Sequence, residues 1–286
     1  MCERLLIFAP IASIQIGERR KLAREHIVSG GAIVAQNGGV CALLLLNRVL
    51  DGAPLFVGAN RDEYYNRPSR PPEVFVINGR RVAAPRDARS GGTWIGVNEN
   101  GVFVGITNRP GEIDTTFPSR GEIVMLALGA ANAEEGKSTV EERMNLNKYN
   151  PFQLFIADRT RAFFMVNDGS PARELERGVH LLTNEHGLNS LRVGGIEVFE
   201  SIHEPAAAEM FMKSFLRDHS LHDRGHQFCK HREERGTVSS TIIKISDGAA
   251  SKAEFIQFLF AGGAPCVTDY LPGVTKNGIT PFAPSA

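Results

Sequence analysis

A pair of apolar segments joined by a short turn is the strongest constraint on the fold of this 286-residue chain. Cys41 begins the first segment, which continues to Leu46, and Gly52 lies in the turn. The second segment, residues 55–59, is followed directly by Asn60-Arg61-Asp62-Glu63. Apolar runs separated by a Gly/Pro turn are typical of a β-hairpin. In an antiparallel pair, the thiol would lie beside the polar end of the second strand.

Two interpretations of this hairpin are open on its residues alone. Free cysteine is among the most buried residue types, so Cys41 fits a buried strand position as well as a nucleophile. Asn and Asp are also common where a strand passes into a turn, which is a structural explanation for the polar run.

A resemblance favours the functional interpretation. Asn60–Glu63, together with Tyr64, Arg67 and Pro68, resembles the motif that gives the NRDE family its name, also called the transport and Golgi organisation protein 2 family. Further blocks follow in the family's order: Gly91–Gly96, Thr107-Asn108, Ser119–Gly121, Leu182–Asn184 and Gly236–Thr241.

The apolar periodicity predicts a layered α+β fold. The resemblance implies more, namely the four-layer αββα sandwich of N-terminal nucleophile hydrolases. We expect helices at 122–131, 139–144 and 205–219. We expect strands at 41–47, 54–60, 73–77, 94–97, 101–107, 153–157, 162–167, 179–183, 239–246 and 254–260.

The start of the domain is a separate question. Family members typically begin Met-Cys, whereas here Val40 precedes Cys41 and 39 residues precede Val40. A GTG codon is translated as Val inside a reading frame but as Met when it is the start codon. Our first hypothesis is therefore that the native protein starts at codon 40 and that removal of the initiating methionine exposes Cys41. A propeptide cleaved before Cys41 and an ordinary N-terminal extension are the alternatives. We expect residues 1–39 to be a dispensable, poorly ordered leader and residues 40–286 to form a single domain.

A cysteine at the N-terminus carries its own base. A thiol of ordinary pKa is mostly protonated at neutral pH, and a free α-amine can accept its proton. Asp62 would accept a hydrogen bond from the α-ammonium or hold Arg61, and Asn60 would orient either group. Arg61 would lower the thiol pKa or bind a substrate carboxylate in bidentate fashion. Asn108 and Asn184 each follow a predicted strand, and both patterns resemble the oxyanion-hole asparagines of choloylglycine and penicillin acylases. The resulting catalytic set is Cys41, Asn60, Arg61, Asp62, Asn108 and Asn184, and the expected substrate contacts are Glu63, Trp94, Ser239 and Ser240.

Composition limits the partners. The chain has 32 Lys and Arg against 32 Asp and Glu, whereas a nucleic-acid binder would need a basic surplus. No apolar run approaches the ~20 residues of a membrane span. Four cysteines without framework spacing favour the reducing cytoplasm. We therefore expect a small-molecule substrate or ligand, with acyl-containing compounds among the candidates; neither substrate identity nor oligomeric state follows from the sequence.

One segment is rich in metal-binding residue types: His219, His222, His226, Cys229 and His231. The spacing is irregular and no matching second pair is evident elsewhere in the sequence, so we expect a solvated loop, with no metal and no cofactor.

Two functions remain open. The first is a hydrolase or acyltransferase that cleaves an amide or thioester through a Cys41 acyl-enzyme. The second is a non-catalytic ligand-binding or trafficking protein, related to lipid or haem as the resemblance implies. The reactivity of Cys41 distinguishes them.

Overall fold

The computed structural model describes residues 41–190, 195–220, 227–247 and 256–273, which form two antiparallel sheets and four helices. The predicted leader, residues 1–39, lies outside the described residues. The first sheet contains, in spatial order, β10 (Gly178–Thr183), β1 (Ala42–Leu50), β2 (Ala53–Tyr64), β11 (Arg235–Ile245), β12 (Ile256–Ala261) and β13 (Leu271–Pro272).

The second sheet follows the chain order throughout, although two helices lie between its fourth and fifth strands in the sequence. Its strands are β3 (Ser69–Ile77), β4 (Arg80–Asp87), β5 (Ile95–Asn98), β6 (Phe103–Asn108), β7 (Phe152–Ala157), β8 (Ala162–Val166) and β9 (Arg173–Glu174). The helices are α1 (Arg120–Leu128), α2 (Ala133–Leu146), α3 (Ile196–Ser201) and α4 (Pro205–Arg217).

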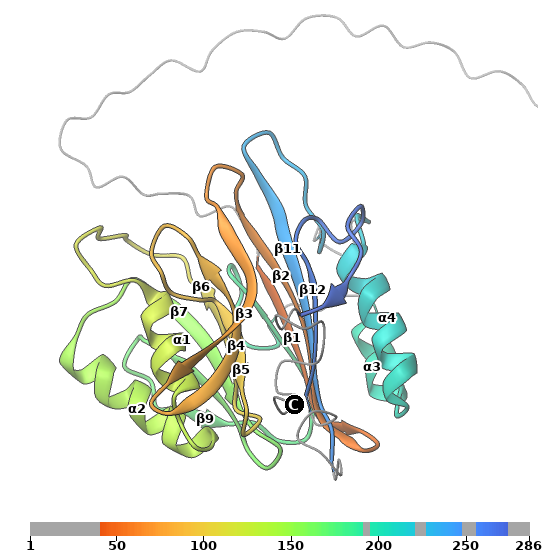
Figure 1. The fold of residues 1–286 in the computed structure, drawn as a ribbon, viewed down its shortest axis with the longest axis horizontal. Helices are drawn as coiled ribbons and strands as arrows, with labels where there is room; N and C mark the ends of the chain where they lie inside the picture. The colour runs from red at the N-terminus through yellow and green to blue at the C-terminus, as the bar shows by residue number, and fades with distance from the viewer. Residues whose placement is uncertain (1–40, 191–194, 221–226, 248–255, 274–286) are drawn as a thin grey trace, which may run out of the picture. The chain divides into compact units, whose positions relative to one another are not determined.

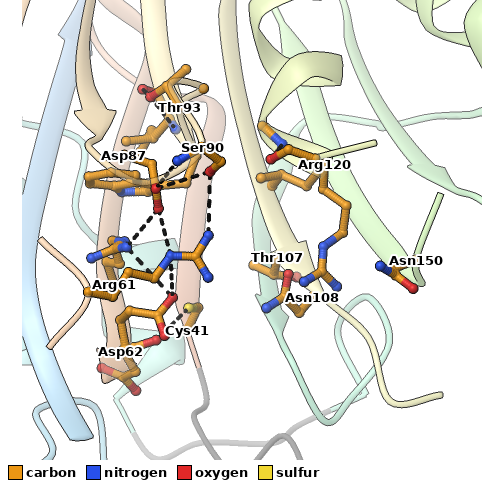
Figure 2. Close-up of a pocket in the computed structure, with 18 of the residues that line it drawn as sticks. Cys41, Arg61, Asp62, Asp87, Ser90, Thr93, Thr107, Asn108, Arg120 and Asn150 are labelled. Atoms are coloured by element: carbon orange, nitrogen blue, oxygen red, sulfur yellow. Dashed lines mark hydrogen bonds and ion pairs between the residues drawn. The ribbon is translucent and has the colours of Figure 1, made fainter. Parts of the chain in front are cut away.

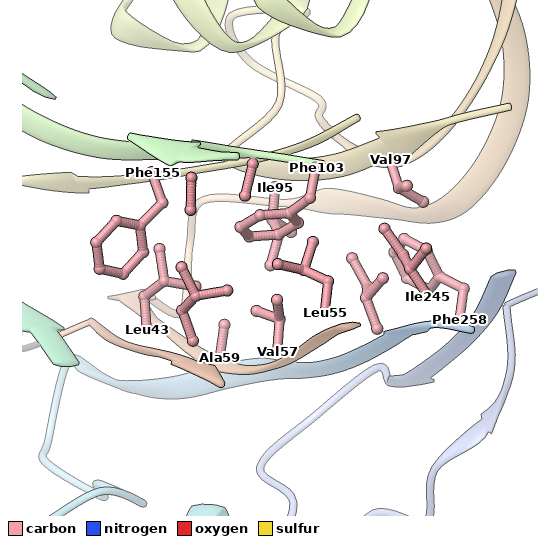
Figure 3. Close-up of a cluster of buried hydrophobic side chains, with 14 of the residues drawn as sticks. Leu43, Leu55, Val57, Ala59, Ile95, Val97, Phe103, Phe155, Ile245 and Phe258 are labelled. Carbon is pink, nitrogen blue, oxygen red and sulfur yellow. The ribbon is translucent and has the colours of Figure 1, made fainter. Parts of the chain in front are cut away.

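Three apolar cores separate four layers (Figure 1). The central core lies between the two sheets and contains Leu43, Val57, Phe103 and Phe155 (Figure 3). A second core joins the first sheet to α3 and α4, and a third joins the second sheet to α1 and α2. The layer order is therefore helix, sheet, sheet, helix, and the αββα sandwich implied by the resemblance is confirmed.

Side-chain alternation decides which residues of the hairpin face the central core. Successive strand residues point to opposite faces. Leu43 and Leu45 of β1, like Val57 and Ala59 of β2, point between the sheets. Cys41 is two residues before Leu43, and Arg61 is two residues after Ala59. Both therefore lie on the face of the first sheet that is turned toward the second sheet.

The first hairpin is confirmed, but β2 is longer than expected. It continues through the polar run to Tyr64 because β11 pairs with it along this whole length, from Ile245 opposite Leu55 to Arg235 opposite Tyr64. The polar run is thus strand and not turn.

Strand β4 was not expected, because its sequence, RRVAAPRD, lacks an alternating apolar pattern. It pairs with β3 through a turn at Asn78-Gly79, where both residues have positive φ, +49° and +77°. That combination is typical of a type I′ hairpin turn, which Asn-Gly favours. None of the described helices combines the length and apolar character that crossing a bilayer requires.

Candidate active site

A cavity of about 370 Å³ lies at the end of the sheets where β1 begins. Both sheets and the start of α1 contribute to its walls. Cavities of this size are typical of small-molecule sites. Of the residues predicted from the sequence, the walls include Cys41, Asn60, Arg61, Asp62, Glu63, Trp94 and Asn108.

Cys41 directly precedes β1 and is half-buried. Its Sγ lies 3.6 Å from the main-chain oxygen of Asp62, to which the thiol donates. Burial raises the pKa of the thiol to about 11, and the nearby carboxylate of Asp62 adds to the shift, against the opposing charge of Arg61. In this chain, where Cys41 is preceded by Val40, the thiol is therefore protonated at neutral pH.

Arg61 reaches from β2 to the other sheet. Its Nη2 lies 3.2 Å from Oδ2 of Asp87 at the end of β4, and its guanidinium lies over the Trp94 ring, 4.4 Å from the centroid (Figure 2). Arg67 contacts the same carboxylate oxygen at 2.8 Å. Glu63 lies 3.6 Å from Arg61 and 3.7 Å from Arg67. Arg61 is thus held in place by two acidic groups and an aromatic ring.

Asp62 points away from the central core. Its Oδ1 accepts a 2.6 Å hydrogen bond from the Thr237 hydroxyl, and its Oδ2 lies 3.6 Å from Nζ of Lys230. All three side chains are buried. Burial raises the pKa of Asp62 to about 6, although the charge of Lys230 and the bond from Thr237 act in the opposite direction.

Two predicted side chains are turned to the helical layer. The amide of Asn60 donates to the carbonyl oxygens of Leu216 (2.9 Å) and Phe228 (2.8 Å), so it anchors α4 although Asn60 borders the cavity. The hydroxyl of Ser240 donates to Ala59 O at 3.1 Å and bonds the Tyr270 hydroxyl at 2.6 Å. The structure does not bring either side chain to the Cys41 thiol.

Asn184 and Ser239 are placed beside the site by strand register. Thr183 pairs with Ala42, so the next residue, Asn184, follows the strand end alongside Cys41, and it is buried. Ser239 pairs with Arg61, and its buried hydroxyl has no hydrogen-bond partner among the described residues. Neither residue belongs to the cavity wall.

The wall opposite Cys41 includes Thr107, Asn108, Arg120 and Asn150 (Figure 2). Thr107 is buried, and within the described ranges its hydroxyl has no hydrogen-bond partner. Arg120 donates to Pro151 O at 3.1 Å, and no described carboxylate forms an ion pair with it. This wall therefore presents polar groups, one of them cationic, to whatever enters.

Close backbone contact fixes Arg120 at the cavity. A Cβ on Gly92 would lie 2.8 Å from the carbonyl carbon of Gly121, the second residue of α1. Gly91 has φ +72°, a conformation that side chains rarely adopt. The glycine pair thus combines an unusual φ at Gly91 with a close backbone approach at Gly92.

Four residues of this region were not predicted as site residues: Asp87, Thr107, Arg120 and Lys230. Thr107 and Arg120 lie inside blocks that carry the family resemblance, which is the signal that could have identified them. No local pattern marks Asp87, because its partners Arg61 and Arg67 lie 26 and 20 residues earlier.

Comparisons with known proteins agree with the motifs. The family model described as Transport and Golgi organisation 2 matches residues 41–223. The human Transport and Golgi organization protein 2 homolog is 30% identical over 112 residues, which is 38% of this chain and 40% of that protein. The mouse homolog is 34% identical over 108 residues, 36% of this chain and 38% of that protein. The aligned part spans about two-fifths of the length of these curated relatives.

Solved structures with a similar arrangement include penicillin V acylase from Agrobacterium tumefaciens (11% identity, TM-score 0.45, 85% of this chain and 98% of that chain). A Caenorhabditis elegans ortholog of N-acylethanolamine-hydrolyzing acid amidase is also similar (10% identity, TM-score 0.41, 75% and 96%).

Proposed function

We propose, from the premise that this chain belongs to the Transport and Golgi organisation 2 family, that it is a cysteine hydrolase or acyltransferase of the N-terminal nucleophile type. Its substrate would contain an amide or thioester bond, and Cys41 would carry the acyl group. The observation that carries the proposal is the place of Cys41, at a cavity between two sheets and beside the polar run Asn60–Glu63 of β2.

The active form in this proposal begins at Cys41. Its free α-amine takes the thiol proton, and the sulfur attacks the substrate carbonyl carbon. The tetrahedral intermediate collapses with cleavage of the C–N or C–S bond, and the ammonium returns the proton to the leaving group. Water then attacks the thioester, the α-amine accepts one proton, and the acid leaves as the thiol is restored.

The cavity wall opposite Cys41 carries polar side chains that can donate hydrogen bonds to the carbonyl oxygen of the substrate. Asn108 ends β6 across the cavity from Cys41, and the Thr107 hydroxyl is a buried donor without a partner within the described part of the chain. Asn184 extends the strand beside Cys41. Donors aimed at a developing oxyanion lower such barriers by ~3 kcal/mol each. We assign the oxyanion to Asn108 and Asn184, with Thr107 as an additional donor.

Arg120 supports a substrate that carries a carboxylate. Arg61, the residue that the sequence favoured for this role, is already paired with Asp87 and Glu63. The guanidinium of Arg120 faces the cavity without an acidic partner among the described residues. An N-acyl amino acid offers both the scissile amide and the carboxylate, and arginine binds carboxylates in bidentate fashion.

One observation favours the carrier function instead. The thiol pKa of about 11 leaves Cys41 unreactive while Val40 is attached, so a chain that keeps residues 1–40 could hold a ligand without reacting with it.

The test places a site-specific protease site immediately before Cys41, so that one folded sample is assayed before and after exposure of the amine. A panel of N-acyl amino acids, neutral N-acyl amides and acyl-CoA thioesters is screened for product, and intact mass detects the acyl-enzyme. We expect turnover and an acyl adduct only after cleavage, and neither in Cys41→Ala.

Full turnover by Cys41→Ala would refute the nucleophile. Saturable ligand binding with no turnover in cleaved protein, unchanged by Cys41→Ala, would establish the carrier function.

A further inference from the structure

A cluster of two cysteines and two histidines lies outside the cavity. It consists of His219, Cys229, His231 and Cys266, and their candidate ligand atoms all lie within 4.8 Å of one another. None of the four belongs to the wall of the Cys41 cavity. The cluster shares His219, Cys229 and His231 with the segment noted in the sequence, and it adds Cys266, which the sequence analysis did not connect with that segment. His222 and His226 lie outside the described residues.

Three separate chain segments bring these side chains together. His219 follows the end of α4, Cys229 and His231 precede β11, and Cys266 lies in the connection after β12. The main-chain N–H of Cys229 donates to Asp218 O at 3.0 Å, which joins the first two segments. His231 forms an isolated bridge with Gly236, which fixes the approach to β11. Backbone contacts thus hold the segments of His219, Cys229 and His231 in place.

The distances fit tetrahedral coordination. Nε2 of His231 lies 3.2 Å from Sγ of Cys266 and 3.7 Å from Sγ of Cys229. Zinc bound at ~2.3 Å from sulfur and ~2.0 Å from nitrogen separates its ligand atoms by about 3.3–3.8 Å. The rings of His219 and His231 are parallel, with centroids 5.0 Å apart, and His219 is exposed.

We propose that His219, Cys229, His231 and Cys266 form a closed structural site for one Zn²⁺ ion. Two thiolates balance the ion's charge, and two imidazoles complete the four ligands that structural zinc sites use. Soft sulfur ligands favour zinc over Mg²⁺ or Ca²⁺, which take oxygen ligands. With four protein ligands the ion has no open position, so its role is to join segments.

The site has a structural connection to the candidate active site. The neighbours of Cys229 both contact the polar run of β2, since Phe228 O accepts from the Asn60 amide and Lys230 lies 3.6 Å from the Asp62 carboxylate. The ion therefore fixes the segment that supports Asn60 and Asp62 from the helical side. This site does not depend on the proposed hydrolase activity.

The test is metal analysis of the full chain, purified without a histidine tag or metal column. We expect about one zinc per chain by elemental mass spectrometry. Replacement by Co²⁺ should give a thiolate-to-cobalt charge-transfer band and the visible bands of a tetrahedral ion. Cys266→Ser and His219→Asn, at the less buried positions, should each weaken zinc binding at least ~100-fold in competition with a chromogenic chelator.

Cys41→Ser and His203→Asn are matched controls outside the cluster and should keep the metal. Folding of each variant is checked by circular dichroism, and zinc protection of Cys229 and Cys266 from alkylation gives a second readout in the unmutated chain. Substoichiometric zinc with no cobalt spectrum would overturn the proposal. So would a Cys229–Cys266 disulfide in the purified protein, or equal metal loss in Cys41→Ser.

Discussion

The thiol of Cys41 donates to the main-chain oxygen of Asp62, 21 residues later, at an S–O distance of 3.6 Å. The contact joins the start of β1 to the polar end of β2, which the hairpin register brings side by side. The same neighbourhood disfavours the thiolate, because burial and the Asp62 carboxylate both raise the thiol pKa. In the proposed hydrolase, Cys41 therefore needs a base before it can act as the nucleophile.

We predict that Cys41 reacts slowly in the uncut chain. A thiol of pKa about 11 is ionised roughly 300-fold less at pH 7.5 than an ordinary cysteine. Its alkylation by iodoacetamide should be slower by about this factor than that of a cysteine in an unstructured peptide with an ordinary thiol pKa. Exposure of the α-amine should accelerate it at least ~10-fold. Peptide mapping by mass spectrometry follows Cys41 separately from Cys229 and Cys266. Equal rates before and after cleavage would contradict an amine-assisted thiol.

The ion pairs between the sheets should contribute strongly to stability. Asp87→Asn leaves the buried Arg61 and its neighbour Arg67 without their shared carboxylate, so we expect a loss of about 3 kcal/mol in the free energy of unfolding. Asp168→Asn is the matched control, because its pair with Arg109 is exposed and should contribute less than ~1 kcal/mol. Urea unfolding of both variants measures the difference, and similar losses would argue against a special role for Asp87.

Arg120 should determine preference for a substrate carboxylate. Removing a charged hydrogen bond of ~1.5–3 kcal/mol in Arg120→Gln predicts a KM about 10- to 100-fold higher for an N-acyl amino acid. The KM for a neutral N-acyl amide should not change. Arg109→Gln, at an exposed ion pair with Asp168, controls for loss of a positive charge. Steady-state kinetics of Arg120→Gln on both substrates measure the two KM values. An equal rise in KM for the N-acyl amino acid and the neutral amide would show that Arg120 does not bind the carboxylate.

The protonation of Asp62 should affect stability between about pH 4 and pH 6. Its folded-state pKa, about 6, lies above the ordinary 3.8 of the unfolded chain, so the folded protein holds this proton more tightly. The resulting stabilisation is fully present below about pH 4 and is lost as the pH rises through about 6. A shift of about two units corresponds to at most ~3 kcal/mol. Denaturant unfolding of wild type and Asp62→Asn across this range should show the difference between them changing in this direction, and a constant difference would contradict it.

Local patterns explain most of the fold predictions. The first hairpin depends on residues close in sequence, so its strands and turn follow from apolar runs around Gly52. The length of β2 does not, because the polar run from Asn60 stays extended only where β11 pairs with it. Strand β4 was missed for the same reason, since its burial comes from neighbouring strands and its own sequence has no alternation.

The sequence by itself determined the family, the sandwich and the position of Cys41 beside Asn60–Glu63, because these follow from ordered motifs and from the two-residue period of a hairpin. Only the tertiary structure decided which long-range partners meet. It paired Arg61 with Asp87 from the other sheet, turned Asn60 toward α4, placed Arg120 at the cavity and added Cys266 to the histidine–cysteine cluster. Those contacts depend on how the layers pack, and local periodicity carries no information about which distant side chains the packing brings together.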